Sequence, residues 1–208
     1  MKRRFKMRAN EFLNFSMLGA LLIIFGILIN QYYEPKTVWH HSEVEAVNSL
    51  IQIYNAEWKW YNSDIDDNNT ADFWTRDIAG LFFYTHPKTG NKIKFIPKEI
   101  ATADLDPYPS FYMGNTIEKA PYKGYCFKMA LYDENGFFQA KADPATGIHY
   151  QNEKFFVIAF PKFNKNLRTF IIDTNKKVLY RKINSIGEAD KWPNDPEKEG
   201  WKELDFKK

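Results

Sequence analysis

The sequence predicts an α+β fold in which an amino-terminal transmembrane helix precedes one long helix packed on an antiparallel sheet of about five strands. Three observations lead to this prediction. Residues 12–29 form an uncharged apolar run, residues 42–62 carry apolar side chains at helical spacing, and the segments after residue 120 alternate between apolar and polar side chains. The 208 residues allow one sizeable domain with an appendage.

The net charge of +3 is concentrated at the amino end. The first 11 residues hold five basic side chains and one acid, whereas the remainder holds 24 basic and 25 acidic residues. Proteins that bind nucleic acid concentrate positive charge on the folded body, so this distribution argues against a nucleic-acid partner. The 18 Phe, 12 Tyr and 6 Trp residues are sufficient for a firm core or an interface. A single cysteine, Cys126, excludes an internal disulfide.

The run "FLNFSMLGALLIIFGILI", residues 12–29, is predicted to be a membrane anchor. As a helix it would extend roughly 27 Å, which is close to the hydrocarbon thickness of a bilayer. A cleaved secretory signal would have a shorter apolar core and a small-x-small cleavage site, and the following "NQYYEPK" offers none. A buried core helix is the third alternative.

Charges on the two sides of this run predict its orientation. Basic residues precede it and glutamates follow it, which places residues 1–11 in the cytoplasm. Residues 30–41 then form a juxtamembrane linker, and residues 42–208 form a periplasmic α+β domain. The expected location is the inner membrane of a bacterium, crossed once by residues 12–29.

The first element of the outer domain is a helix over residues 42–62. Ser42 and Glu45 have the spacing of a capping box. Apolar side chains at steps of three and four form one stripe, which consists of Val44, Val47, Ile51, Tyr54, Trp58 and Tyr61. This stripe packs either on the domain's own sheet or, less simply, in a short coiled-coil seam.

Strands are predicted after residue 120. Residues 125–133 alternate, Asn135-Gly136 is typical of a hairpin turn, and residues 153–161 are apolar enough for a central strand. Residues 168–174 and 177–183 form another hairpin. Trp192 and Trp201 are expected to attach the carboxyl-terminal tail to the body.

The segment "DIDDNNTADFW" is similar to a calcium loop. Asp64, Asp66, Asn68, Thr70 and Asp72 occupy the ligand positions 1, 3, 5, 7 and 9 of such a loop. Position 12, where a bidentate carboxylate belongs, is Thr75, and Asp77 comes two residues too late. The sequence therefore leaves two interpretations open, a weak calcium site or a helix-ending turn with Asn and Asp as caps.

No set of residues in the sequence indicates catalysis. The four histidines lack metal-binding spacing, and Cys126 is expected to be a small, half-buried apolar residue. The sequence contains no nucleophile elbow, phosphate loop, dinucleotide fingerprint or HExxH motif. We therefore predict a protein without enzymatic activity, catalytic residues or a cofactor, with calcium as the alternative. A cluster of perturbed carboxylates in a deep pocket would favour an enzyme instead.

Several stretches together resemble a known group of proteins. They include "YNAEWKWYNSDIDDNNTADFWTRDIAGLFF", "IPKEIATAD", "APYKGYCFKM", "FFVIAFPKFNKNLRTFIIDTNKKVLYRKI" and "WPNDPEKEGW". These stretches resemble uncharacterised bacterial membrane-anchored, pseudopilin-like proteins related to the DUF2950 group. The resemblance implies a hydrophobic helix presenting a small pilin-like α+β head. It departs from true pilins at Lys6, where the processing signal needs a glycine.

These observations predict a membrane-anchored cell-envelope protein that acts in protein–protein assembly. Its expected partners are the membrane, through residues 12–29, and either itself or other envelope proteins. The residues expected to make these contacts are the anchor and the helix stripe from Val44 to Tyr61. The alternative is a tethered binding module that uses calcium in the loop 64–72.

Overall fold

The computed structural model describes residues 39–86, 88–107, 117–130 and 154–205, and the backbone of four short strands between residues 132 and 151. All of them belong to one compact unit, Trp39–Lys208. The predicted segment 1–11, the anchor 12–29 and the linker up to residue 38 lie outside the described residues. Within the described part of the chain, no helix is long and apolar enough to cross a membrane.

The centre of the unit is an antiparallel sheet of five strands in the order β10-β9-β8-β7-β2. The strands are β2 (Tyr125–Met129), β7 (Phe156–Pro161), β8 (Thr169–Asp173), β9 (Val178–Arg181) and β10 (Lys202–Glu203). Every residue of β8 is buried, because the sheet is covered on both faces. The α+β class and the antiparallel five-stranded sheet are thus confirmed. The fifth strand, β10, comes from the tail, where no strand was predicted.

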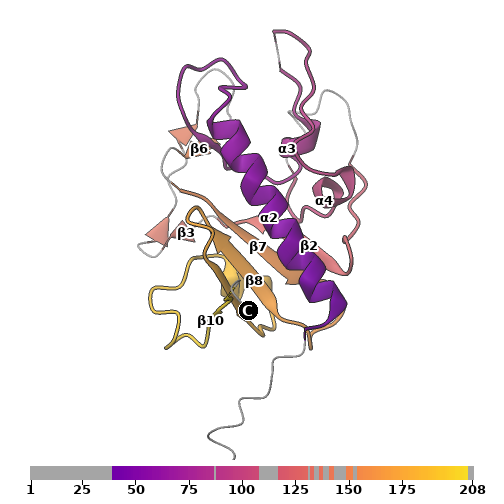
Figure 1. Cartoon of the computed structure of the whole chain (residues 1–208), viewed down its shortest axis with the longest axis vertical. Coiled ribbons are helices and arrows are strands. Elements are labelled where there is room, and N and C mark those ends of the chain that lie inside the picture. Colours follow the sequence, from indigo (N-terminus) through magenta and orange to yellow (C-terminus); the bar gives the residue numbers. More distant parts are fainter. Residues whose placement is uncertain are drawn as a thin grey trace, which may run out of the picture. The chain divides into compact units, whose positions relative to one another are not determined.

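Helix α2 (His41–Tyr61) lies across one face of the sheet (Figure 1). Leu50 and Ile53 are completely buried in the core between helix and sheet, and Trp60 is 1% exposed. The predicted stripe contributes Val47 to this core, and its members Ile51, Tyr54, Trp58 and Tyr61 pack against the edge of the core. Val44, the first member, is 44% exposed. The buried face of α2 is therefore rotated away from the face that the largest apolar side chains indicate.

The start of α2 also differs from the prediction. The N-cap is His40 rather than Ser42, and Glu43 takes the place of Glu45 in the capping box. The Nδ1 atom of His40 accepts the Ser42 amide at 3.2 Å, and the His40 amide donates to Glu43 Oε2 at 2.9 Å. The Ser42–Glu45 prediction was wrong because a long-range contact of Glu43, described below, fixes the helix start.

The opposite face of the sheet is covered by the carboxyl-terminal segment. This segment contains the 3-10 helix η2 (Ile186–Ala189) and β10. Trp201, 3% exposed, joins the second hydrophobic core on this face, and Trp192 stacks on Phe156 with ring centroids 5.0 Å apart. The prediction that the two tryptophans attach the tail is confirmed.

The remaining elements are short. Strands β1 (Phe73–Trp74), β6 (His149–Gln151) and β5 (Lys141–Ala142) form a three-stranded sheet in that order, and helices α3 (Gly80–Phe83) and α4 (Lys98–Thr102) lie beside α2. Strand β3 (Tyr132–Asp133) pairs with β4 (Gly136–Phe137), with Asp133 opposite Gly136. The predicted hairpin is present, but Gly136 lies in a strand rather than in the turn.

A substitution at Gly80 tests how tightly α3 packs against Trp74. A Cβ atom at Gly80 would lie 2.3 Å from two ring atoms of Trp74, whose side chain is completely buried and has no space to move. Gly80→Ala is therefore expected to lower the free energy of unfolding by about 1–3 kcal/mol. Urea unfolding of the detergent-solubilised chain, followed by tryptophan fluorescence, measures this.

Gly187→Ala is the matched control. At Gly187 the nearest atom to an added Cβ is Ser185 Oγ at 3.8 Å, an ordinary contact distance. The free energy of unfolding should change by less than about 0.5 kcal/mol. Equal effects of the two substitutions would contradict the packing described for Trp74.

Candidate functional site

The loop 64–72 is held together by its own side chains. Asp64 Oδ1 accepts the backbone amides of Asn68 and Asn69 at 3.1 and 3.2 Å. The side-chain amide of Asn68 donates to Asp66 Oδ2 at 2.8 Å and to Asp72 Oδ2 at 3.0 Å. Asp64 and Asn69 have φ values of +40° and +58°, which Asp and Asn tolerate better than other residues. These contacts form a turn after α2.

The predicted calcium ligands are brought together in part. Asp66, Asn68 and Asp72 converge through the Asn68 amide, whereas Thr70 interacts with Asn68 through its backbone amide at 2.7 Å. No group of three or more His, Cys, Asp or Glu side chains with the arrangement of a metal site is found among the described residues. Calcium binding stays a prediction.

The pKa of Asp72 is raised to about 6. Burial is the main cause, and the charges of Asp66 and Asp64 add to it, while the hydrogen bond from the Asn68 side chain opposes it. The loop thus concentrates negative charge around a carboxyl that is 4% exposed. Asp67, in the same loop, places its Oδ2 atom 3.1 Å from the Nε2 atom of the buried His86. This contact connects the loop to the segment 84–93.

A second group of carboxyls, which sequence patterns did not reveal, lies inside the compact unit 39–208, which we call the head. Asp104 Oδ2 accepts the amides of Ile78 and Ala79, both at 2.8 Å. Asp77 Oδ1 accepts the Gly80 amide at 2.8 Å and the Trp74 indole N–H at 3.1 Å. The two aspartates satisfy the free amides at the start of α3. Asp77 is therefore not a late ligand of the loop 64–72, as a non-standard calcium site would require.

Burial and mutual repulsion perturb these carboxyls. The pKa of Asp104 is raised to about 7, mainly by burial and next by the charge of Asp77. Glu57 on α2 is completely buried, and burial raises its pKa well above the ordinary value. The Trp74 backbone amide partly offsets this rise, and the charge of Asp77 increases it. Asp77 and Asp104 are each 2% exposed, so this cluster is closed to a substrate.

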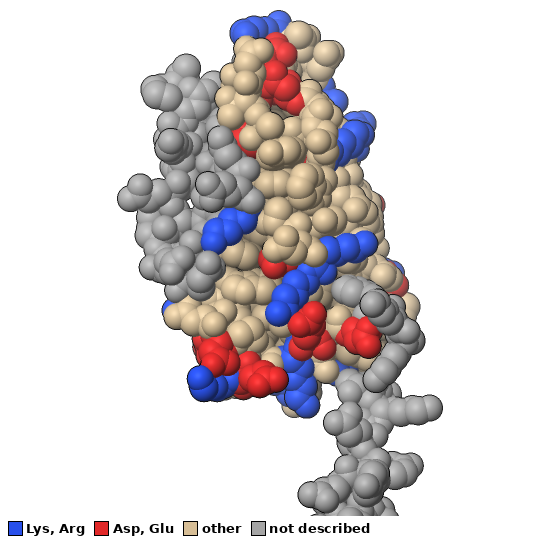
Figure 2. Space-filling model, turned by 60° about the vertical axis from the view of Figure 1, so that its left-hand side comes forward, with Lys and Arg blue, Asp and Glu red and all other residues tan. Residues whose placement is uncertain are grey.

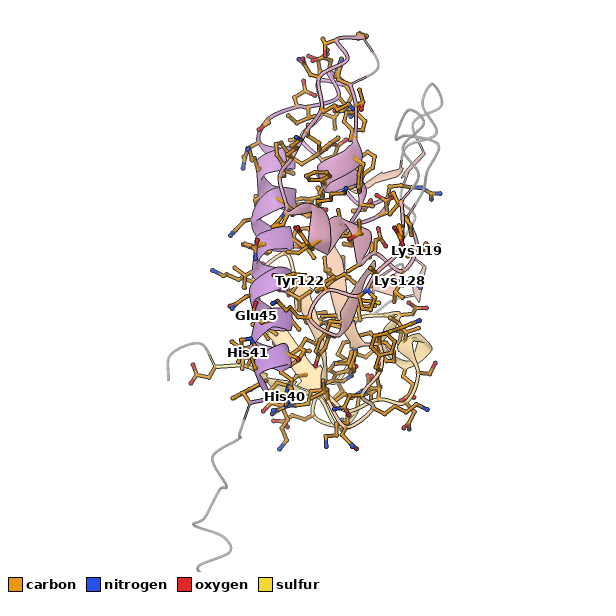
Figure 3. All side chains as sticks on the ribbon, turned by 90° about the vertical axis from the view of Figure 1, so that its right-hand side faces the viewer. His40, His41, Glu45, Lys119, Tyr122 and Lys128 are labelled. Carbon is orange, nitrogen blue, oxygen red and sulfur yellow. The ribbon has the colours of Figure 1, made fainter. Side chains whose placement is uncertain are left out.

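The histidines and Cys126 have local roles. His40 caps α2, His41 and Glu45 follow it along the helix (Figure 3), and the Nδ1 atom of His86 accepts the amides of Lys88 and Thr89. Cys126 is a free thiol that is 6% exposed in β2, and burial raises its pKa. It is more buried than the half-buried position expected.

Two open grooves border the carboxyl-terminal segment. The larger, of about 630 Å³, lies between β9 and the tail and is lined by Lys177, Trp201 and Glu203 among others. The smaller, of about 340 Å³, is lined by Asp173, Asn175 and Trp192 among others. Acidic and basic groups are mixed in both, and on the face that Figure 2 shows the two signs are also interspersed. The buried cluster of Glu57, Asp77 and Asp104 lines neither groove.

Three hydrogen bonds join Arg168 to Glu43 at the start of α2. The Nε and Nη2 atoms of Arg168 donate to the two carboxylate oxygens of Glu43 at 2.8 and 2.6 Å, and the Arg168 amide adds a third bond at 2.9 Å. The Trp39 ring lies 3.9 Å from the guanidinium carbon and stacks on Phe170. We call Trp39, His40, Glu43, Arg168 and Phe170 the entry clamp.

Electrostatics stabilise the entry clamp in its charged form. The side chains of Glu43 and Arg168 are 3% and 12% exposed. Burial alone would raise the pKa of Glu43, but hydrogen bonds from Arg168 and His40 and the Arg168 charge lower it below the ordinary value. The hydrogen bond to Glu43 raises the pKa of Arg168 in turn. Both groups therefore remain ionised at neutral pH.

Comparison with known proteins gives no relatives. No family model matches the chain, and no match to a curated protein or a solved structure was found.

Glu57 provides a test of the buried carboxyl cluster. Its pKa is raised in the folded chain, so the unfolded chain releases the proton near pH 4.5 while the folded chain retains it to higher pH. Wild-type stability therefore falls, through this group, as the pH rises above about 4.5, by up to about 1.4 kcal/mol per pH unit. Glu57→Gln removes this loss.

The expected result is a stability advantage of Glu57→Gln that is absent near pH 4 and grows towards pH 8. Urea unfolding at several pH values measures it. Glu99→Gln is the control, because Glu99 is exposed on α4. A difference between Glu57→Gln and the wild type that does not vary with pH would exclude the raised pKa.

Proposed function

We propose that the chain is a non-enzymatic, membrane-anchored protein of the bacterial cell envelope, with residues 12–29 in the inner membrane and a pilin-like head in the periplasm. In this proposal the head assembles with further copies of itself or with another envelope protein. The pilin-like character is supported by the 21-residue helix α2, which follows the predicted anchor and packs across an antiparallel sheet.

The observation that carries the proposal is the entry clamp. A head that is only tethered to a membrane needs no fixed entry point, because a flexible linker suffices. Here Trp39 packs against two residues in or beside the sheet. They are Phe170, which lies in β8, and Arg168, which directly precedes that strand. The start of α2 is thereby fixed to the middle strand of the sheet. Such a connection supports a role in which α2 and the sheet meet a partner as one body.

The stripe from Val44 to Tyr61 is a poorer contact surface than the sequence indicates. Five of its six members pack in or against the hydrophobic core. The exposed side of α2 instead carries Val44 among the polar residues His41, Asn48, Gln52, Asn55 and Lys59. An assembly contact through α2 would therefore be polar around one apolar residue.

Cross-linking in intact membranes tests this proposal. The full chain, carrying an epitope tag, is expected to remain in membranes after alkaline carbonate extraction and to give discrete adducts of higher mass with a lysine-reactive reagent. In the control, residues 1–38 are replaced by a cleavable secretory signal, which releases the head and should abolish the adducts. A chain recovered in the soluble fraction without carbonate would refute the anchor, and a membrane-bound chain without adducts would refute assembly.

The alternative function, a calcium-dependent binding module, is favoured by the convergence of Asp66 and Asp72 on one amide. Under our proposal, millimolar calcium leaves the melting temperature unchanged, because Asn68 already occupies these oxygens. A ligand that binds only the folded state would raise it. A rise that is lost in Asp66→Asn but kept in Asp106→Asn, an exposed control, would establish the alternative instead.

A further inference from the structure

One end of the sheet carries an exposed aromatic ring among lysines. Phe163, in the turn between β7 and β8, is 77% exposed, the highest value among the large apolar side chains that the structure describes. Lys162 and Lys165 in the same turn are also exposed. The turn therefore presents one aromatic ring to solvent between two exposed lysines.

Two further lysines lie at this end because of the strand register. The Lys162 amide donates to Gly124 O at 2.9 Å, which brings the turn with Lys123 beside the turn with Phe163. Thr169 pairs with Arg181, so Lys182 follows at the same end of the sheet. We call Lys123, Lys162, Phe163, Lys165 and Lys182 the hairpin-end surface.

No described acid forms an ion pair with the lysines of this surface. Lys123 approaches the Tyr122 ring, at 5.8 Å from its centroid. Glu43, the acid nearest to the start of α2, is buried and bonded to Arg168. Glu188 follows Lys182 in sequence, and its carboxylate accepts the amides of Asn184 and Ser185. Glu199 also lies near this end, since its carbonyl oxygen accepts Arg181 Nη1 at 2.6 Å, and its carboxylate accepts the amides of Asn194 and Asp195. The four lysines therefore outnumber the nearby acids, and the surface is basic.

The entry clamp determines what this surface faces. Arg168, next to the turn with Phe163, holds Glu43 and the start of α2, so the chain enters the head at the hairpin end. If residues 12–29 are an anchor, the residues 30–38 between anchor and head span at most about 30 Å when fully extended. The anchor then limits the distance of the hairpin-end surface from the lipid headgroups to about 30 Å.

We propose that the hairpin-end surface binds the anionic lipid surface in which the chain is anchored, with Phe163 inserted among the headgroups and the lysines on phosphates. Aromatic rings favour the interface between headgroups and acyl chains, and lysines near an anionic leaflet are attracted to it over about one Debye length. This inference rests on the proposed function. It adds a second contact that fixes the tilt of the head on the membrane.

A fluorescent probe on the full chain tests the proposal. Cys126→Ser with Asn166→Cys places a nitrobenzoxadiazole label in the turn while keeping Phe163 and the lysines. The chain is reconstituted in vesicles of phosphatidylethanolamine and phosphatidylglycerol, or of phosphatidylcholine, with a nitroxide lipid as quencher. Lys88→Cys is the matched label position in the segment 84–93, beyond the other end of α2, which is roughly 30 Å long.

The label at residue 166 is expected to be quenched strongly in vesicles with phosphatidylglycerol, and the label at residue 88 is not. Each lysine reversed to glutamate should reduce the ratio of docked to undocked heads at least fivefold. Lys162→Glu/Lys165→Glu should therefore abolish most of the quenching, and Phe163→Ser should weaken it. Lys88→Glu/Lys92→Glu, with the same charge change in the segment 84–93, should have no effect.

Equal quenching at the two label positions would overturn the proposal. So would quenching that is the same in phosphatidylcholine and insensitive to the lysine reversals, because proximity through the anchor alone would explain it. If the surface binds an acidic protein instead, the label stays unquenched in these protein-free vesicles, which also overturns it. Failure of the proposed function is distinguishable, since carbonate would then release the whole chain from the vesicles.

Discussion

The ion pair between Arg168 and Glu43 is the contact on which the arrangement of the head depends. The residues are 125 positions apart in the sequence, and both side chains are almost completely buried. A buried carboxylate is unfavourable unless its oxygens are paired, and here three donors of Arg168 and the amide of His40 pair them. Removal of one partner from such a pair typically costs about 3–5 kcal/mol.

This ion pair lies on the side of α2 that is buried against the sheet. Glu43 bonds to Arg168 beside β8, and Leu50 and Ile53, about two and three turns further along the same side of the helix, face the sheet. The same side carries Glu57 into the interior, where Asp77 and Trp74 are its neighbours. The buried side of α2 thus carries a paired carboxylate near its start and a carboxyl with a raised pKa near its end.

The sequence predicts those parts of the fold that depend on local pattern. Alternation and apolar runs identify β7, β8 and β9, and the two tail tryptophans indicate their own packing. Local pattern could not predict the rotation of α2, because Ala46 and Glu57 on the buried face look unsuitable while Tyr54 and Trp58 on its margin look ideal. Local pattern also could not predict that Asp104 accepts hydrogen bonds from the amides of Ala79 and Ile78, which are 25 and 26 residues away in the sequence. In the sequence, Glu43 and Arg168 look like ordinary surface charges, because their contact joins residues 125 positions apart.

The two edges of the five-stranded sheet are unsuited to pairing with a strand of another chain. The outer edge of β2 is bonded to the segment after α4, through Phe127 N to Ala103 O at 2.9 Å and Leu105 N to Phe127 O at 2.8 Å. The opposite edge, β10, is a two-residue strand with an exposed lysine and glutamate. Covered edges and short charged edges both oppose the addition of a strand from another chain. In the assembly proposed above, contacts would therefore be made by side chains rather than by a strand added at either edge.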